Sequence, residues 1–250
     1  MTESLASTPR QHLRILTPAR VGLGRTGVSQ QIADQLSFQR AHALARDAVH
    51  ARLEAAALAA KLADISGHEV LRLHSMAVDR ATYLQRPDLG RILDQRSEST
   101  LEHLRHNSWE LILVVADGLS ALAVERHAAP LIRELLPRLD SFQIAPLCIV
   151  EQGRVAIGDA IASTLGAQLS VILIGERPGL SAPDSLGAYI TWEPRLGRLD
   201  ADRNCISNIR AEGLSYTQAA ALLVFYLTEA RRRRLTGVAL KPESPRIEAD

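Results

Sequence analysis

The chain has 250 residues, with 29 basic and 28 acidic side chains and a hydrophobic fraction of 46%. These values are typical of a globular protein with a sizeable core, so extended disorder is excluded except at the two ends. Balanced charge and an aromatic content of 4% argue against a nucleic-acid-binding protein, and no apolar run is long enough for a membrane-spanning helix.

The first part of the chain is predicted to be a tail followed by helix. Residues 1–20 contain two prolines and no apolar leader, so we expect a flexible tail on a protein that is not secreted. Over residues 28–63 apolar side chains recur at three- and four-residue steps, and 51–60 is rich in alanine. This spacing predicts helix, which Gly67 ends.

A turn and a further helix are predicted before the chain changes character. Pro87 and Gly90 mark a turn within residues 83–93, and 97–106 is expected to be a helix with a polar face. Few β-branched residues occur up to this point, which favours helix over strand. We therefore assign residues 21–105 to a small helical N-terminal domain and its connector.

The second half has the pattern of a parallel α/β domain. Residues 111–116, LILVVA, form a short, wholly apolar run, as a strand buried on both faces does. Further strands are predicted at 143–150 and 170–175, and helices at 121–138, 157–166 and 217–234. Because strands and helices alternate, the predicted fold class is α/β, with a Rossmann-like doubly wound parallel sheet over 106–238 and a disordered tail at 239–250.

The loops after the predicted strands form the expected ligand edge. In doubly wound domains ligands lie off the carboxyl ends of the strands. The stretch 176–208, which follows the third strand, has little periodicity yet holds many apolar residues, so a functional segment is favoured over disorder. Glu176 at its start needs a partner, which either Arg177 or a ligand could supply. Cys205 is either a small buried side chain or a pocket contact.

A glycine-rich segment is a candidate for dinucleotide binding. Gly22–Gly27 matches GxGxxG, whose glycines let a pyrophosphate approach a helix N-terminus. However, a proline interrupts the segment before it, and no strand–helix–strand unit follows. A flexible entry to a helix is therefore favoured, with a nicotinamide site as the alternative.

The remaining patterns favour structural roles. Asp117–Ser120 follows a strand, but no GxSxG frames the serine, so a turn and helix cap is preferred to a nucleophile. His103 and His106 have no evident third partner, so no metal site is predicted. The arginines at 231–234 suit the end of a helix, with a subunit contact as the alternative. The cysteines do not form a CxxC pair and are expected to be free thiols in a reducing cytosol.

Five strings, in one consistent order between about residues 15 and 235, resemble the light chain of ethanolamine ammonia-lyase. They are VGLGRTG at 21–27, YLQRPDLGR at 83–91, ADGLS at 116–120, GERPGLSAPDSLGAYITW at 175–192 and DRNCISNI at 202–209. The resemblance explains the GxGxxG match as a family segment with no nicotinamide role.

The resemblance implies the small subunit of a carbon–nitrogen lyase that converts ethanolamine to acetaldehyde and ammonia by a radical mechanism with adenosylcobalamin. In this family the heavy chain holds the substrate, and the light chain covers the corrin and helps enclose the nucleotide tail. The assembly is a hexamer of heavy–light pairs. No catalytic residue is therefore expected here, and the chain should be inactive without the heavy chain. The fold of the family agrees with the one predicted above.

The resemblance also assigns three cobalamin contacts. They are Val155 in GRVAIGD, Glu176 in GERPGL and Cys205 in CISN. Val155 and Glu176 follow predicted strands and so lie at the ligand edge. The sequence has no DxHxxG motif, which in other cobalamin proteins supplies a histidine to cobalt. We therefore expect base-on cobalamin, with its own dimethylbenzimidazole as the lower ligand and cobalt not ligated by this chain.

The sequence leaves alternatives open for both the cellular location and the function of the protein. Family members often carry a longer N-terminal extension that targets a bacterial microcompartment, whereas this chain begins almost at the matched region. We expect a cytoplasmic protein, with microcompartment targeting in doubt or left to the heavy chain. One functional alternative is an NAD-dependent oxidoreductase that uses the Gly22–Gly27 loop. The other is a light-chain-like protein that has lost its partner.

Overall fold

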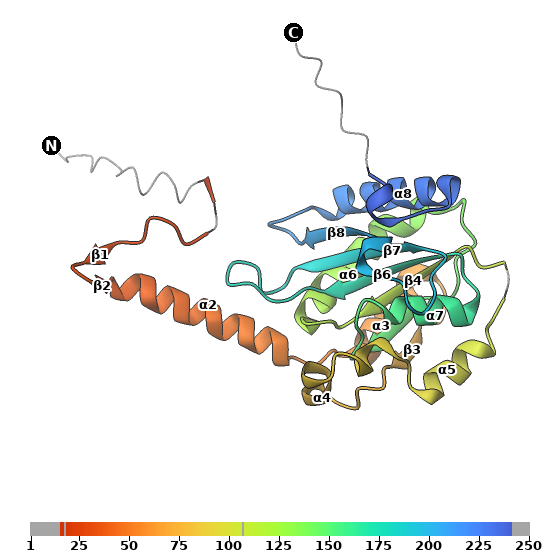
Figure 1. The fold of residues 1–250 in the computed structure, drawn as a ribbon, viewed down its shortest axis with the longest axis horizontal. Coiled ribbons are helices and arrows are strands. Elements are labelled where there is room, and N and C mark those ends of the chain that lie inside the picture. Colours follow the sequence, from red (N-terminus) through yellow and green to blue (C-terminus); the bar gives the residue numbers. More distant parts are fainter. Residues whose placement is uncertain (1–15, 18, 107, 242–250) are drawn as a thin grey trace, which may run out of the picture.

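The computed structural model describes residues 16–17, 19–106 and 108–241. The described chain begins with a hairpin of β1 (Arg25–Thr26) and β2 (Ser29–Gln30), followed by α2 (Ile32–His50) and α3 (Ala55–Ser66). Figure 1 shows α2 reaching away from the body of the molecule, whereas α3 packs against it.

A six-stranded mixed sheet forms the centre of the molecule (Figure 1). Its strands are β3 (Leu71–His74), β4 (Leu111–Ala116), β5 (Cys148–Glu151), β6 (Leu169–Gly175), β7 (Leu186–Trp192) and β8 (Arg203–Ile209). The strand order is β3-β5-β4-β6-β7-β8. The first four strands run parallel to one another, and β7 runs antiparallel to both β6 and β8. β4 lies inside the sheet with every side chain buried, as its apolar sequence predicts.

Helices cover both faces of the sheet. Those that follow β3 are α4 (Arg80–Gln85), α5 (Gln95–Glu102), α6 (Ala121–Leu135), α7 (Ile157–Leu165) and α8 (Tyr216–Arg233), with 3-10 turns at Leu89–Arg91, Leu136–Arg138, Asp200–Asp202 and Gly237–Ala239. The core on one face is shared with α3, α6 and α8, and the core on the other with α5 and α7. Gly166 ends α7 in the left-handed conformation, as predicted.

The predicted α/β class is confirmed, but the helix predicted over 28–63 is two helices. The break lies between α2 and α3, where Ala51 is extended and the Glu54 backbone N–H donates to the Glu125 carboxylate at 3.0 Å. This contact with α6 turns α3 onto the sheet, and leaves α2 largely outside it. A tertiary contact of this kind leaves no trace in the local spacing of apolar residues.

Three strands, β3, β7 and β8, were not predicted from the sequence. β3 lies within the region predicted to be helical, and its four residues are too few to show a period. The stretch 176–208 contains β7 and most of β8, and β7 runs antiparallel to both of its neighbours, β6 and β8. β8 is the edge strand with a largely polar sequence, RNCISNI, which hides its strand character.

The two predicted tails lie largely outside the described residues. Within the second tail, Leu240 is buried and its carbonyl accepts a hydrogen bond from the Asn204 side chain at 2.8 Å. Across the residues that are described, no helix is both long enough and apolar enough to cross a membrane.

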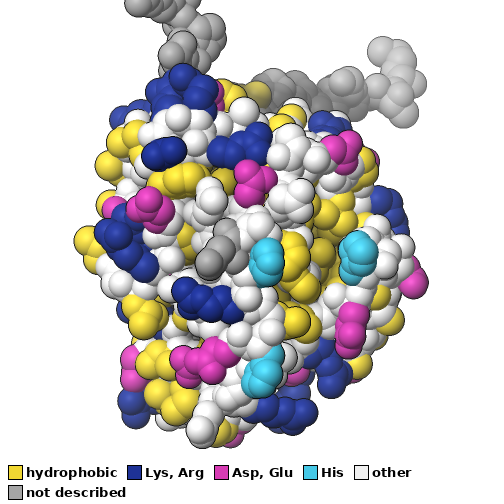
Figure 2. Space-filling model, turned by 90° about the vertical axis from the view of Figure 1, so that its right-hand side faces the viewer, with side chains coloured by type: hydrophobic (Ala, Val, Ile, Leu, Met, Phe, Trp, Pro, Cys, Tyr) yellow, Lys and Arg dark blue, Asp and Glu magenta, His cyan; other side chains and the backbone are white. Residues whose placement is uncertain are grey.

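The amino edge of the sheet, seen in Figure 2, carries an apolar hollow. Hydrophobic side chains gather there between scattered histidines. The hollow has a volume of about 590 Å³, and Leu104, Trp109, Phe142 and Ile144 contribute to its wall. It lies at the end of the sheet opposite to the predicted ligand edge.

Candidate functional site

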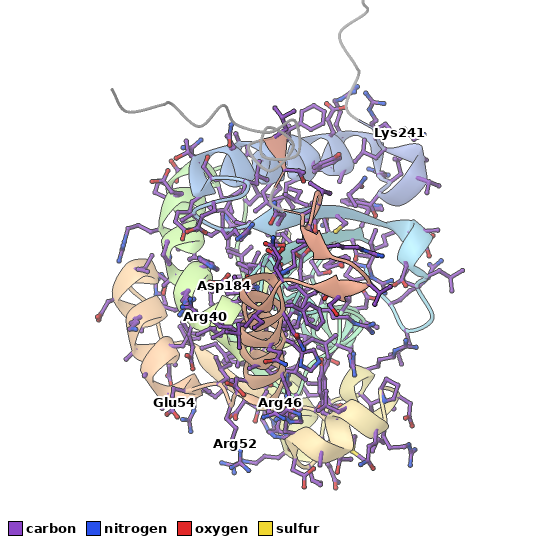
Figure 3. The ribbon with its side chains drawn as sticks, turned by 90° about the vertical axis from the view of Figure 1, so that its left-hand side faces the viewer. Arg40, Arg46, Arg52, Glu54, Asp184 and Lys241 are labelled. Atoms are coloured by element: carbon purple, nitrogen blue, oxygen red, sulfur yellow. The ribbon has the colours of Figure 1, made fainter. Side chains whose placement is uncertain are left out.

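The carboxyl ends of the parallel strands form the edge at the left of Figure 1, which faces the viewer in Figure 3. The loops 117–120, 152–156 and 176–185 leave the sheet here. β7 begins and β8 ends at the same edge, because β7 runs antiparallel to β6 and β8 runs antiparallel to β7. This edge is where the sequence predicts ligand contacts.

Glu176 ends β6 and is tied to the edge strand. Its carboxylate accepts hydrogen bonds from the Ser207 hydroxyl and from the Asn208 backbone N–H, the latter at 3.2 Å. Its protein partner is therefore β8 and not Arg177, which is exposed. Glu176 as a whole residue is half-buried.

Cys205 lies on β8 next to Glu176. It pairs with Tyr189 of β7, is exposed and is not in a disulfide. Desolvation raises the pKa of its thiol despite a hydrogen bond with Tyr189, and the Glu176 carboxylate raises the pKa further. The sulfur is therefore a neutral thiol at pH 7 and suits an uncharged contact.

Val155 reaches the same face of the sheet from another element. It lies in the loop between β5 and α7, is half-buried, and packs against the core beneath α7. Tyr189 packs against the same core. The structure therefore puts Glu176 and Cys205 on neighbouring strands and Val155 at the start of the helix on that side of the sheet, with no hydrogen bond recorded between Val155 and the other two.

Loop 176–185 is held in place by side-chain contacts that the sequence did not predict. We call these contacts of Asp184 and Pro183 the clasp. Asp184 forms an ion pair with Arg126 at 2.7 Å and approaches His127 Nε2 at 3.5 Å. Although desolvation opposes it, these two partners hold the pKa of Asp184 below its ordinary value. His127 Nδ1 lies 2.9 Å from the Tyr216 hydroxyl, and the Ser120 hydroxyl donates to the Pro183 carbonyl at 3.1 Å. Long-range pairs of this kind have no signature in local spacing.

A second buried charge cluster lies between the ends of β4 and β5. Asp117 is 1% exposed, and burial raises its pKa to about 6 against the lowering effect of Arg80. Its Oδ1 accepts from the Gly153 backbone N–H at 3.0 Å, and its Oδ2 lies 3.6 Å from Arg80 Nη1. Asp117 is thus a buried acid at the ligand edge and not a helix cap. The capping role belongs to Ser120, whose hydroxyl accepts from the Ala123 N–H at 3.2 Å.

The other sequence candidates do not assemble a site. Gly22–Gly27 leads into the small β1–β2 hairpin, outside the six-stranded sheet, so it lacks the strand–helix setting of a nicotinamide site. His103 and His106 are exposed, and within the described ranges no cluster of three or more potential ligands could hold a metal ion. Arg231 binds the Ser141 carbonyl at 2.8 Å inside the chain.

Comparison with known proteins gives a consistent match along the chain. A family model described as ethanolamine ammonia-lyase light chain (EutC) matches residues 7–241. The ethanolamine ammonia-lyase small subunit of Azotobacter vinelandii is 57% identical over 241 residues, covering 94% of this chain and 89% of the relative. That of Pseudomonas fluorescens is 55% identical over 241 residues (94% and 88%), and that of Ralstonia nicotianae 54% over 253 residues (98% and 93%).

Proposed function

Because the chain belongs to the ethanolamine ammonia-lyase light chain family, we propose that it binds cobalamin at the carboxyl edge of its sheet and covers the active site of the large subunit. As the small subunit of this adenosylcobalamin-dependent enzyme, it is part of a carbon–nitrogen lyase. The reaction converts ethanolamine to acetaldehyde and ammonia. The cofactor, when bound, supplies the radical chemistry, and the protein supplies binding, orientation and exclusion of water.

The residues at the edge fit such a group. Corrin is a large apolar macrocycle with carboxamide side chains, so it needs apolar packing together with a few donors and acceptors. Val155 and Tyr189 offer apolar surface, and each carboxylate oxygen of Glu176 can accept a hydrogen bond in addition to the one from β8. Cys205 adds a small neutral contact between them. The observation that carries the proposal is the exposure of these side chains on one face of the sheet beside α7.

The proposed lower ligand of cobalt is the cofactor's own dimethylbenzimidazole. The sequence lacks DxHxxG, and none of the three proposed contacts is a histidine. Val155, Glu176 and Cys205 then contact the cofactor without touching the metal. The electron paramagnetic resonance spectrum of the cob(II)alamin complex tests this, since labelling histidine with nitrogen-15 should leave the superhyperfine splitting unchanged.

The proposed partner is the large subunit, in a hexamer of large–small pairs. The named relatives are small subunits, and a small subunit has a larger partner. Helix α2 stands beside the carboxyl edge and reaches outward, and Figure 3 looks along it past Arg40 and Arg46. On its outer side Ile32 and Leu36 are 75% and 59% exposed. A partner held there would lie over the edge that carries Val155, Glu176 and Cys205.

Co-expression with the large subunit tests the proposal. We expect a complex that binds cobalamin and forms acetaldehyde from ethanolamine only when adenosylcobalamin is added. Light scattering on the complex gives its stoichiometry, and cell fractionation shows whether it stays in the cytoplasm or sediments with microcompartment shells. A complex that forms but neither binds cobalamin nor turns over ethanolamine would mean a light-chain-like protein without the lyase role.

A further inference from the structure

The carboxyl ends of β4 and β5 form a topological switch point. After β4 the chain crosses to α6 on one face of the sheet, and after β5 it crosses to α7 on the other. Open α/β sheets bind ligands at switch points of this kind. Here the segment 152–155 directly follows β5, and Val155 at its end is one of the proposed corrin contacts.

Two guanidinium groups and a tyrosine pack together at this switch point. The Tyr83 ring is fully buried, with the Arg80 guanidinium 4.8 Å and the Arg154 guanidinium 4.1 Å from its centroid. Its hydroxyl donates to the Gly153 carbonyl at 3.2 Å. Arg80 has a structural role, because its guanidinium donates hydrogen bonds to the backbone carbonyls of Val49 and Gly118, each at 2.7 Å. The tyrosine therefore holds Arg154 in a fixed plane at the ligand edge.

Polar atoms without partners gather in the same place. Among the described residues, buried side-chain atoms that lack a hydrogen bond include Gln152 Oε1, Arg154 Nε and Arg80 Nη2. Gln152 is 8% exposed and adopts a φ of 56°, a conformation that a residue with a side chain rarely takes. Buried polar groups without partners are uncommon in native proteins, and strained residues gather at functional sites.

The donor and acceptor character of these atoms indicates which chemical group of a ligand could bind them. Gln152 Oε1 can only accept a hydrogen bond, whereas the arginine nitrogens can only donate. A primary carboxamide satisfies both, since its NH2 group donates and its carbonyl accepts. A phosphodiester has no donor for Gln152 Oε1, and the buried Asp117 carboxylate beside Arg80 disfavours a second anion.

Resting on the proposed function, we propose that Gln152 and Arg154 bind a carboxamide side chain of the corrin. The amide carbonyl accepts from Arg154, and the amide NH2 donates to Gln152. Val155 follows directly in the chain, so a single loop contacts both the apolar macrocycle and one of its polar arms. Arg80 and Tyr83 act behind them as positioning residues.

The test measures cofactor binding to the complex of both subunits without relying on turnover. The complex is titrated with hydroxocobalamin and with dicyanocobinamide, and binding is followed by absorbance. Dicyanocobinamide keeps the carboxamides but lacks the nucleotide phosphate. We expect Gln152→Met and Arg154→Lys each to weaken both probes about tenfold, equal to about 1.4 kcal/mol. The matched controls are Gln85→Met and Arg91→Lys, which make the same changes at exposed positions on α4 and the turn after it. They should change neither affinity.

Each other outcome overturns the assignment in a distinguishable way. Unchanged affinity with a lowered melting temperature of the cofactor-free complex would mean that water or the fold itself uses these atoms. Weakened binding of hydroxocobalamin alone would mean a phosphate contact. Failure of the unmodified complex to bind either probe would remove the proposed function itself, and no variant would be needed to see it.

Discussion

At the end of β6, one carboxylate joins two strands and is also a proposed contact of the cofactor. Glu176 accepts from Ser207 and Asn208 across the edge of the sheet. The sequence could place Glu176 at a strand end, because the apolar run SVILIG before it is unmistakable. It could not give the partner, because Ser207 is 31 positions away in a polar edge strand.

Glu176→Gln should affect both cofactor affinity and fold stability. The amide keeps one acceptor oxygen but loses the charge, so we expect cobalamin to bind more weakly by about 1–2 kcal/mol. The weaker bonds to β8 should also lower the melting temperature of the cofactor-free chain. Ser207→Ala is the control, because it weakens the bond to β8 and leaves the carboxylate. Equal affinity in the two variants would mean that Glu176 only supports the fold.

Asp117 should give the fold a characteristic dependence on pH. Burial raises its pKa to about 6, above the ordinary value of 3.8, so the folded chain favours the protonated acid. Its contribution to stability is complete below about pH 4 and is lost as the pH rises through 6. Two pKa units correspond to about 3 kcal/mol.

Urea unfolding of the native chain and of Asp117→Asn between pH 4 and pH 8 measures this contribution. Asn stays neutral over the whole range and keeps an acceptor for the Gly153 N–H. The free energy of unfolding of the native chain minus that of the variant should fall between pH 4 and pH 6 and then level off. A difference that rises with pH would show that Arg80, and not burial, dominates the pKa of Asp117.

Among the elements, long buried ones were predictable and short or exposed ones were not. β4, β6 and α6 to α8 could be predicted because apolar runs, alternation with helix and a glycine at a helix end all agree. β3 and β8 could not, because the first is short and the second is a polar edge. The contacts of Asp184 with Arg126 and His127, and the packing around Tyr83, could not be predicted, because they join side chains that are distant in the sequence.

Helix α2 is the element that we propose contacts the large subunit. Ile32 and Leu36 lie one turn apart and are largely exposed, so they contribute little to the stability of the isolated chain. Burying such side chains is worth about 1.5–3 kcal/mol each. We therefore expect Ile32→Ser with Leu36→Ser to weaken association with the large subunit at least about tenfold, measured by light scattering or biolayer interferometry, with an unchanged melting temperature.

Leu199→Ser is the matched control for the α2 variant. Leu199 is 68% exposed but belongs to the β7–β8 connection, away from α2. It should leave association unchanged. If both variants weakened association equally, the effect would reflect surface hydrophobicity in general and not a contact made by α2.

At the scale of the whole molecule, the three side chains that the family resemblance assigns to the cofactor lie on one face of the sheet and are at most half-buried. Cys205 and Ser207 are exposed on β8, and the described residues include no cluster of groups that could hold a metal ion. Radical intermediates need a site closed to water, which one open sheet face does not give. The division into a helical part at 21–105 and a Rossmann-like part at 106–238 remains our proposal for its domains.

The purified chain should therefore have no lyase activity. With ethanolamine and adenosylcobalamin but no large subunit, we expect no acetaldehyde above the background without enzyme. Adding the large subunit should restore activity in the same cuvette, which excludes a damaged preparation. Turnover by the chain alone would mean that it contains a complete active site that the described residues do not reveal.

The clasp on loop 176–185 has a thermodynamic consequence for cofactor capture. Fixing a free backbone costs about 1–2 kcal/mol of conformational entropy per residue. Here Arg126, His127 and Ser120 immobilise the loop when the chain folds, so that this entropy is lost before the cofactor arrives. The cofactor would then bind to a surface that is already ordered, so that little of the binding free energy is offset by the cost of ordering the loop. The cofactor-free small subunit should thus resemble its bound form at this loop, and the cofactor should dissociate without first unfolding it.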